Sequence, residues 1–193
     1  MKSEIKTIIL PEGTFDVLTH SYDESDRSKL FGMYKKWVEL SKELKSFGGR
    51  GINLPAEGLS EPAFCIEMNC IRIGGGVTGA NTSWDCYDLK TSSRIQVKAC
   101  SVLPDLSSFG PKSEWDELYF VDFYNKGNFD GTFRIFRIPN DLIYNHKVNA
   151  DETFREQQQQ KRRPRFSIYN EIILANNINP VKVGDLSLIE LEI

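Results

Sequence analysis

A chain of 193 residues can bury a hydrophobic core without disulfide support, and its 40% hydrophobic and 26% charged residues are typical of a globular protein. Its net charge of -3 argues against a generally basic nucleic-acid-binding surface, and no apolar run reaches the roughly 20 residues of a membrane span. We therefore expect a single domain over residues 1–193 with no membrane association.

The N-terminal residues contain one short apolar run and no secretion signal. The run TIIL at residues 7–10 ends at Pro11, so an edge strand or a tail is expected here. This beginning predicts a cytoplasmic protein with reduced thiols. The cysteines lack the paired spacing of zinc ligands, and we expect them to be buried structural thiols. They are Cys65, Cys70, Cys86 and Cys100.

Helical periodicity is clearest over residues 25–47, where apolar residues recur on one helical face before a pair of glycines. A second helix is expected over residues 61–70. Ser60 is its N-cap candidate, and Glu61 suits the positive end of the helix dipole. The run CIRI at residues 70–73 then predicts a strand.

The rest of the chain alternates strand and helix signals. A hairpin is expected around KTSS at residues 90–93, followed by two strands joined by NKGNFD. Asn149 is the N-cap candidate of a helix that ends before Pro164. The tail from residue 167 predicts a short helix, a turn and a final strand. The order of elements indicates an α/β fold of the mixed α+β type.

Two short motifs carry no function in this context. GGGVTG at residues 74–79 fits the dinucleotide-binding pattern, but the polar segment ANTSWD follows it where that pattern requires a helix. The Pro104–Asp105 pair lies after the hairpin in a loop rich in serine, glycine and proline. We expect both segments to be loops.

The hairpin contains a candidate metal and lysine site. Side chains at i and i+2 of a strand share a face, so Gln96 and Lys98 lie together. An even turn that pairs Leu89 with Arg94 sets Asp85 opposite Lys98 and leaves Asp88 on the other face. An odd turn or a bulge reverses this assignment. A surface salt bridge between aspartate and lysine is the alternative explanation.

The hairpin SWDCYDLKTSSRIQVKACS resembles the PD-(D/E)XK nuclease core in its glutamine-x-lysine form. From about residue 48 to residue 175 the chain is similar to small type II restriction endonucleases, and in particular to the group that reads GCNGC. This resemblance implies a restriction-endonuclease-like core, with a central mixed sheet flanked by helices. The runs that carry it are GRGINLPAEGLSEPAFC, the hairpin, DELYFVDF, IPNDLIYN and RRPRFSIYNEI.

The resemblance also implies roles for particular residues. Asp85 would bind the metal, Gln96 would be the second ligand through its amide oxygen, and Lys98 would be the catalytic lysine. Glu61 would support the metal or the lysine, with Glu57 as the fallback, although Glu61 also suits a helix end without any catalytic role. Gln96 departs from the acidic pattern, and a neutral amide binds a metal ion more weakly than a carboxylate does. An inactive, degenerate site is therefore an alternative.

The implied activity is Mg²⁺-dependent, sequence-specific cleavage of double-stranded DNA that leaves 5'-phosphate and 3'-hydroxyl ends. A palindromic target implies a homodimer, and restriction implies a cognate methyltransferase that protects the same site. A structure-selective nuclease, such as a junction resolvase or repair enzyme, and a catalytically inactive DNA-binding module are the alternatives. Within QQQQKRRPRF, the expected DNA-binding residues are Lys161, Arg162, Arg163 and Arg165.

Overall fold

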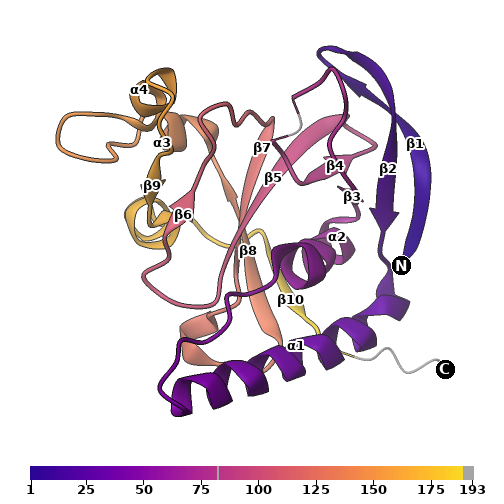
Figure 1. Cartoon of the computed structure of the whole chain (residues 1–193), viewed down its shortest axis with the longest axis vertical. Helices are drawn as coiled ribbons and strands as arrows, with labels where there is room; N and C mark the ends of the chain where they lie inside the picture. The colour runs from indigo at the N-terminus through magenta and orange to yellow at the C-terminus, as the bar shows by residue number, and fades with distance from the viewer. Residues whose placement is uncertain (82, 189–193) are drawn as a thin grey trace.

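The computed structural model describes residues 1–81 and 83–188. A mixed sheet of eight strands runs through them in the order β1-β2-β3-β4-β5-β7-β8-β10 (Figure 1). Strands β5 and β7 pair in parallel, and the other neighbours pair antiparallel. The strands are β1 Lys2–Leu10, β2 Gly13–Ser21, β3 Ile71–Ile73, β4 Cys86–Asp88, β5 Ser93–Cys100, β7 Glu117–Asp122, β8 Thr132–Ile138 and β10 Lys182–Asp185.

Helices flank this sheet, which confirms the predicted fold class. Helix α1 runs along one end, and α2 lies in front of the sheet (Figure 1). The short strands β6 (Ser107–Ser108) and β9 (Arg165–Phe166) form a separate pair beside α3 and α4. The helical segments are α1 Glu24–Ser46, η1 Ala56–Ser60, α2 Glu61–Met68, η2 Asn125–Gly127, α3 Asn140–Tyr144, α4 Phe154–Gln159 and η3 Tyr169–Leu174. None of the helices in the described part of the chain has the length and apolarity needed to cross a membrane.

Helix α1 forms where the apolar periodicity predicts it. Asp23 caps its first turn in a reciprocal capping box with Asp26, which satisfies two amide groups that have no partner within the helix. Leu30, Tyr34 and Trp37 then fall on one buried face.

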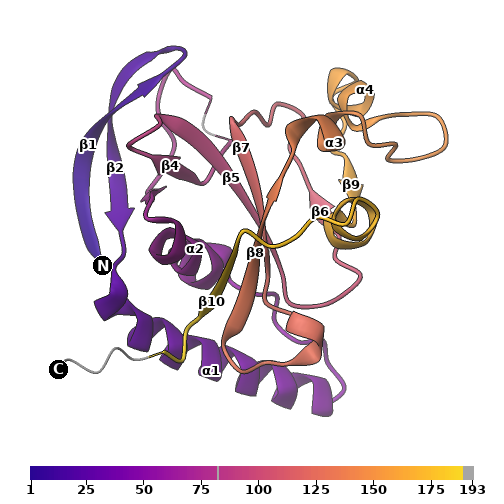
Figure 2. The same cartoon turned by 180° about the vertical axis from the view of Figure 1, so that it is seen from behind.

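The hydrophobic core has two parts, one on each face of the sheet. One part packs α1 and α2 against β5, β7 and β8, with Tyr34, Phe64 and Phe123 among its buried rings. The other part contains Phe109, Phe154 and side chains of the segment after β9. In the back view β8 and β10 lie nearer the viewer, with α2 beyond them (Figure 2). The hairpin β4–β5 is therefore held from both faces.

Three local predictions were wrong or incomplete. Strand β2 was not predicted; it pairs along its whole length with the edge strand β1, which contains the TIIL run. Ser60 makes no capping bond, because its own backbone is already helical at the end of η1. Thr153 caps α4 instead of Asn149, whose side chain accepts hydrogen bonds from two nearby backbone amides in a turn. The predicted final strand is β10, and residues 189–193 of that tail lie outside the described residues.

Candidate active site

A cavity of about 540 Å³ lies between α2, strand β5 and the loop that follows β5. Its lining includes Glu61 from α2, Asp85 from the residue before β4, and Lys98 from β5. The three side chains come from separate elements, yet they face one space. This is the combination of acids and lysine that the sequence singles out.

The register of the β4–β5 hairpin explains why Asp85 faces this cavity. Cys86 pairs with Ile95 and Asp88 pairs with Ser93, so the predicted register, Leu89 with Arg94, was wrong by two residues. The Asp88 carboxylate accepts a hydrogen bond of 2.7 Å from the Lys90 amide and turns the chain one residue earlier than expected. The connection still has an even number of residues, so the predicted sharing of faces holds.

Asp85 is anchored on β5 through one carboxylate oxygen. Its Oδ2 accepts a hydrogen bond of 2.8 Å from the Val97 amide and another from Gln96 Nε2. Oδ1 accepts no hydrogen bond from any residue in the described ranges. Burial raises the pKa of Asp85, while the charge of Lys98 and the bond from Val97 act in the opposite direction. The carboxylate is thus fixed in place, and its other oxygen has no donor among the residues that the structure describes.

Gln96 lies beside Asp85 but does not line the cavity. It is 3% exposed, and its Nε2 atom donates to Asp85 and, over 3.3 Å, to the Val97 carbonyl. As placed, the amide holds Asp85 in position and turns its nitrogen, not its oxygen, toward the carboxylate. Metal ligation by Gln96 requires the amide to rotate so that Oε1 takes the position that Nε2 now has beside Asp85. This role stays a prediction.

Lys98 extends over the ring of Phe109, with Nζ 5.1 Å from the ring centre. Burial lowers the pKa of this amine, and nearby Arg163 lowers it further; the charges of Asp85 and Glu61 raise it. An ammonium group in this setting depends on the two acids for its charge. The lysine is therefore electrostatically coupled to both of the cavity's candidate metal ligands.

Glu61 is the glutamate that lines the cavity. Its Oε2 accepts a hydrogen bond of 2.6 Å from Arg72 Nε on β3. Burial, followed by the charge of Asp85, raises the pKa of Glu61 to about 7, although Arg72 opposes the shift. The fallback residue Glu57 also pairs with Arg72, at 2.8 Å, but its side chain is 81% exposed. Of the two glutamates, Glu61 is the one placed with Asp85 and Lys98.

Replacing Glu61 with glutamine is expected to make the protein more stable at about pH 8 and to change its stability little at about pH 5. The folded-state pKa of Glu61, about 7, lies above the ordinary value of 4.5, so the folded protein binds this proton more tightly than the unfolded chain does. The stabilisation that comes from this proton is fully present below pH 4.5 and is lost as the pH rises through 7. Glutamine is neutral throughout and avoids a loss of about 3 kcal/mol. Urea unfolding at both pH values measures this, and coincident curves at about pH 8 would contradict it.

Two further residues complete the surroundings: Arg72, which the sequence does not single out, and Asp105, which the sequence assigns to a loop without a function. Arg72 donates a hydrogen bond to Glu61. The two residues lie on β3 and α2, so no short sequence motif reveals this pair. Asp105 lines the cavity, but each of its oxygens already accepts two hydrogen bonds, from Ser107, Ser167 and the amides of residues 168 and 169. Asp105 therefore joins the loop after β5 to the start of η3 and has no oxygen left for a ligand.

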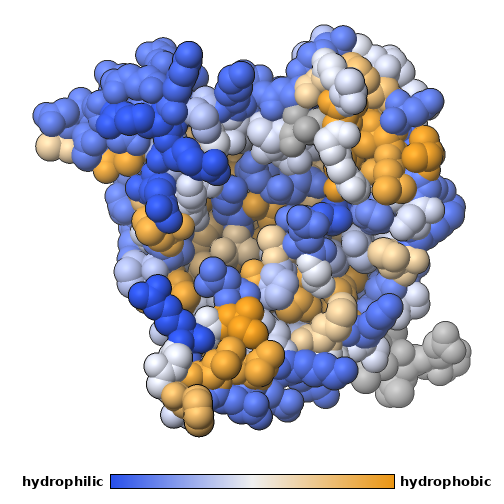
Figure 3. Space-filling view, in the orientation of Figure 1, coloured by the Kyte–Doolittle hydropathy of each residue, from blue (hydrophilic) through white to orange (hydrophobic). Residues whose placement is uncertain are grey.

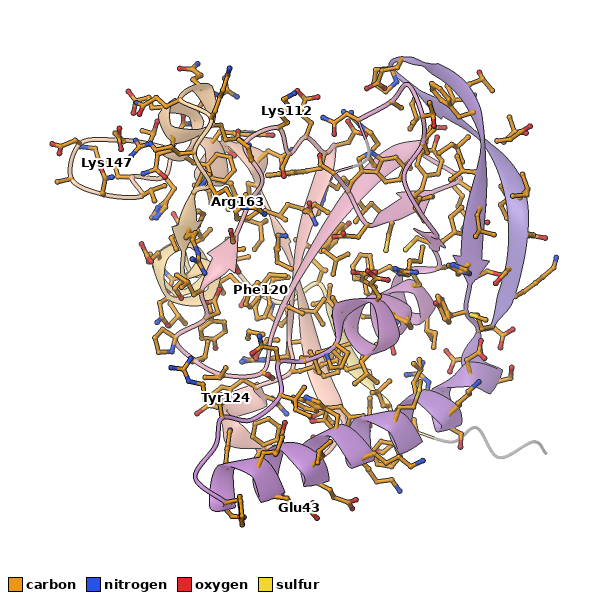
Figure 4. All side chains as sticks on the ribbon, in the orientation of Figure 1. Glu43, Lys112, Phe120, Tyr124, Lys147 and Arg163 are labelled. Carbon is orange, nitrogen blue, oxygen red and sulfur yellow. The ribbon has the colours of Figure 1, made fainter. Side chains whose placement is uncertain are left out.

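The basic segment after α4 lies on the surface, but its residues differ in their contacts. Lys161, Arg162, Arg163 and Arg165 are all exposed. Arg162 pairs with Glu152, whereas Arg163 is close enough to Lys98 to influence its pKa. Hydrophilic residues cover the surface over α4 (Figure 3), and Arg163 lies nearer the centre of the molecule than Lys147 (Figure 4).

The neighbouring glutamines are not all free to read bases. Gln157 is buried and its amide donates to Glu152. Gln158 donates to the carbonyl groups of Gly110 and Ser113 and so ties α4 to the crossover between β5 and β7. Two members of the glutamine run therefore make scaffold contacts, whereas Gln159 and Gln160 are exposed like the basic residues that follow them.

Comparison with known proteins points to one family. The model of the Bsp6I restriction endonuclease family matches residues 22–175, a range that includes every residue named above as lining the cavity. The chain is 34% identical over 173 residues to the type II restriction enzyme Bsp6I of Bacillus sp. (strain RFL6), with 86% of this chain and 94% of that enzyme covered. No solved structure gives a significant match. The chain belongs to the Bsp6I restriction endonuclease family.

Proposed function

We propose that Asp85, Glu61 and Lys98, with Gln96 behind them, form the active site of this type II restriction endonuclease. The observation that carries the proposal is that two acids and a lysine from three separate elements line one cavity. The glutamine-x-lysine spacing on β5 supports assignment of the chain to the PD-(D/E)XK nucleases, as a variant. On this reading residues 1–193 form one nuclease domain.

The side chains around the cavity fit a Mg²⁺ ion. Mg²⁺ prefers oxygen ligands and keeps several waters, so two carboxylates and one amide oxygen are a sufficient protein contribution. Burial raises the pKa of both Asp85 and Glu61, and a cation beside them would offset that cost. Asp85, Glu61 and, after rotation of its amide, Gln96 would hold the ion. A bound Mg²⁺ would neutralise charge on the scissile phosphate and lower the pKa of an attacking water.

The chain's own residues account for orientation and charge in the proposed hydrolysis. Lys98 presents its ammonium group to the cavity and stabilises the negative charge that builds on the phosphate during in-line attack by water. Asp85 and Glu61 keep the lysine charged against the effect of burial. Gln96 and the Val97 amide fix the Asp85 carboxylate. The family resemblance implies products with 5'-phosphate and 3'-hydroxyl ends.

Membership of this family supports a proposal for the target and the partners. We propose that the enzyme cuts double-stranded DNA at GCNGC as a homodimer, one strand per subunit, because a palindromic site matches two-fold symmetry. A methyltransferase acting on the same site would protect the host DNA. Such a pair works in the cytoplasm, where the DNA is. Digestion of a plasmid of known sequence with Mg²⁺ tests the proposal, since the fragment ends report the site.

Each result of that digestion bears on one alternative. Discrete fragments ending at GCNGC support the proposal. Cleavage confined to branched DNA would support a structure-selective nuclease instead. DNA binding without cleavage of any substrate would support a catalytically inactive binding module.

Changing Gln96 to glutamate is expected to lower the Mg²⁺ concentration needed for half-maximal cleavage by about tenfold, equivalent to about 1.4 kcal/mol. The reason is that a third negative ligand, added to Asp85 and Glu61, strengthens cation binding. Without Mg²⁺ the carboxylates repel, so the variant should also gain more thermal stability from Mg²⁺ than the parent does. Unchanged Mg²⁺ dependence would contradict ligation by Gln96 and leave it with the role of holding Asp85.

Changing Arg163 to alanine is expected to weaken DNA binding and to reduce the slope of log affinity against log salt by about one. Arg163 is exposed and lies near Lys98, so it suits a phosphate contact close to the cavity. Arg162→Ala is the matched comparison, because Arg162 already pairs with Glu152. Fluorescence anisotropy at several salt concentrations measures both slopes. A larger change in the Arg162 variant would contradict the assignment.

A further inference from the structure

Three of the four cysteines form a compact group in the part of the core that packs α2 against the sheet. Cys65 Sγ lies 3.5 Å from Cys86 Sγ and 3.7 Å from Cys70 Sγ, and all three sulfur atoms lie within 4.8 Å of one another. None of the three residues is more than 6% exposed. No histidine or carboxylate from the described part of the chain joins the group.

The local backbone explains how the thiols meet. Cys65 points inward from the middle of α2. Asn69 ends the helix in the left-handed conformation, at φ 52° and ψ 48°, and turns the chain so that Cys70 lies next to Cys65. Cys86 follows Asp85, and successive strand residues point to opposite faces. Asp85 therefore lines the cavity, whereas its neighbour Cys86 belongs to the thiol group.

The spacing of the sulfur atoms suits a shared ion. Thiolates bound to zinc at about 2.3 Å, at a tetrahedral angle, lie roughly 3.8 Å apart. The two close sulfur pairs, at 3.5 and 3.7 Å, need little movement to reach that spacing.

We propose that Cys65, Cys70 and Cys86 bind one thiophilic closed-shell metal ion, Zn²⁺ or Cu⁺, as a structural site separate from the nuclease cavity. Soft thiolate ligands select such ions. On binding, the three thiols release three protons to solvent, so the site keeps a net charge of -1 with Zn²⁺ and -2 with Cu⁺. The smaller buried charge favours Zn²⁺, whereas three ligands without a fourth suit Cu⁺.

Such an ion would join the two elements that carry the acids of the cavity. Cys65 lies one helical turn after Glu61 on α2, and Cys86 directly follows Asp85. The ion would therefore stabilise the fold and the relative positions of α2 and β4. It would do so without contacting DNA and without replacing the Mg²⁺ proposed for cleavage.

Metal content and binding test the site without any activity measurement. The full chain is purified without chelator, and zinc and copper are quantified by elemental mass spectrometry; metal-stripped protein is then titrated with Cd²⁺ while thiolate-to-metal absorption is followed. We expect one zinc or copper per chain, saturation by Cd²⁺ at one equivalent, and a higher Tm when the ion is bound. Whichever element is found identifies the ion.

Two alanine variants test whether metal binding requires this group of three cysteines or any buried cysteine. Cys70→Ala should lose the bound metal and the Cd²⁺ signal. Cys100→Ala should keep both, because Cys100 is also buried but contacts Asp122 outside the cluster. Metal-free wild-type protein that takes up no Cd²⁺ while folded would overturn the proposal. Equal uptake by both variants would do the same. Neither result depends on whether the enzyme cleaves DNA.

Discussion

Replacing Lys98 with methionine is expected to reduce the rate of DNA cleavage on the order of a thousand-fold, while the fold and DNA binding persist. Methionine keeps an unbranched stem next to Phe109 and removes only the positive charge. Charge on the phosphate then develops without the ammonium group near it. Single-turnover cleavage of a plasmid at saturating enzyme and Mg²⁺ measures the effect, since binding no longer limits the rate.

Lys90→Met is the matched control for this change. Lys90 belongs to the same hairpin but lies exposed in its turn, away from the cavity lining. It should cleave at the parental rate. If the Lys98 and Lys90 variants cleave equally fast, Lys98 has no catalytic role and the active-site proposal fails.

The elements that the sequence predicts well are those with local causes. Helix α1 follows from apolar spacing and a glycine stop, and the hairpin follows from two strand signals around a polar turn. Strand parity is similarly local: it links Asp85 with Gln96 and Lys98 even though the register was wrong by two residues, because only an odd shift exchanges the faces. The error itself came from Asp88, whose bond to the Lys90 amide moves the turn.

The features that the sequence does not predict arise from contacts between distant segments. Arg72 reaches Glu61 only because β3 packs beside α2, and Asp105 is saturated by the start of η3, more than sixty residues later. The thiol group likewise depends on the packing of α2 against β4. No spacing rule for zinc ligands matches Cys65, Cys70 and Cys86, so the sequence predicts buried thiols and misses their convergence.

Changing Asp85 to asparagine is expected to reduce cleavage on the order of a thousand-fold or more and to remove the stabilisation by Mg²⁺. The asparagine oxygen can accept the bonds that Oδ2 now accepts from Gln96 and Val97, so the hairpin keeps its shape. The other branch then presents an amide nitrogen to the cavity, and this group repels a cation. Cleavage rate and the change in Tm on adding Mg²⁺ are the two measurements.

The unfolding temperature of the Asp85→Asn variant without Mg²⁺ gives an independent test of this account. Because burial raises the pKa of Asp85, the ionised carboxylate costs stability at neutral pH, and the neutral variant should unfold at the same or a higher temperature. Asp88→Asn is the control, since asparagine can still accept the bond from the Lys90 amide. It should cleave DNA and respond to Mg²⁺ as the parent does. Loss of cleavage in the Asp88 variant, with cleavage retained in the Asp85 variant, would transfer the metal-binding role to the other aspartate of the hairpin.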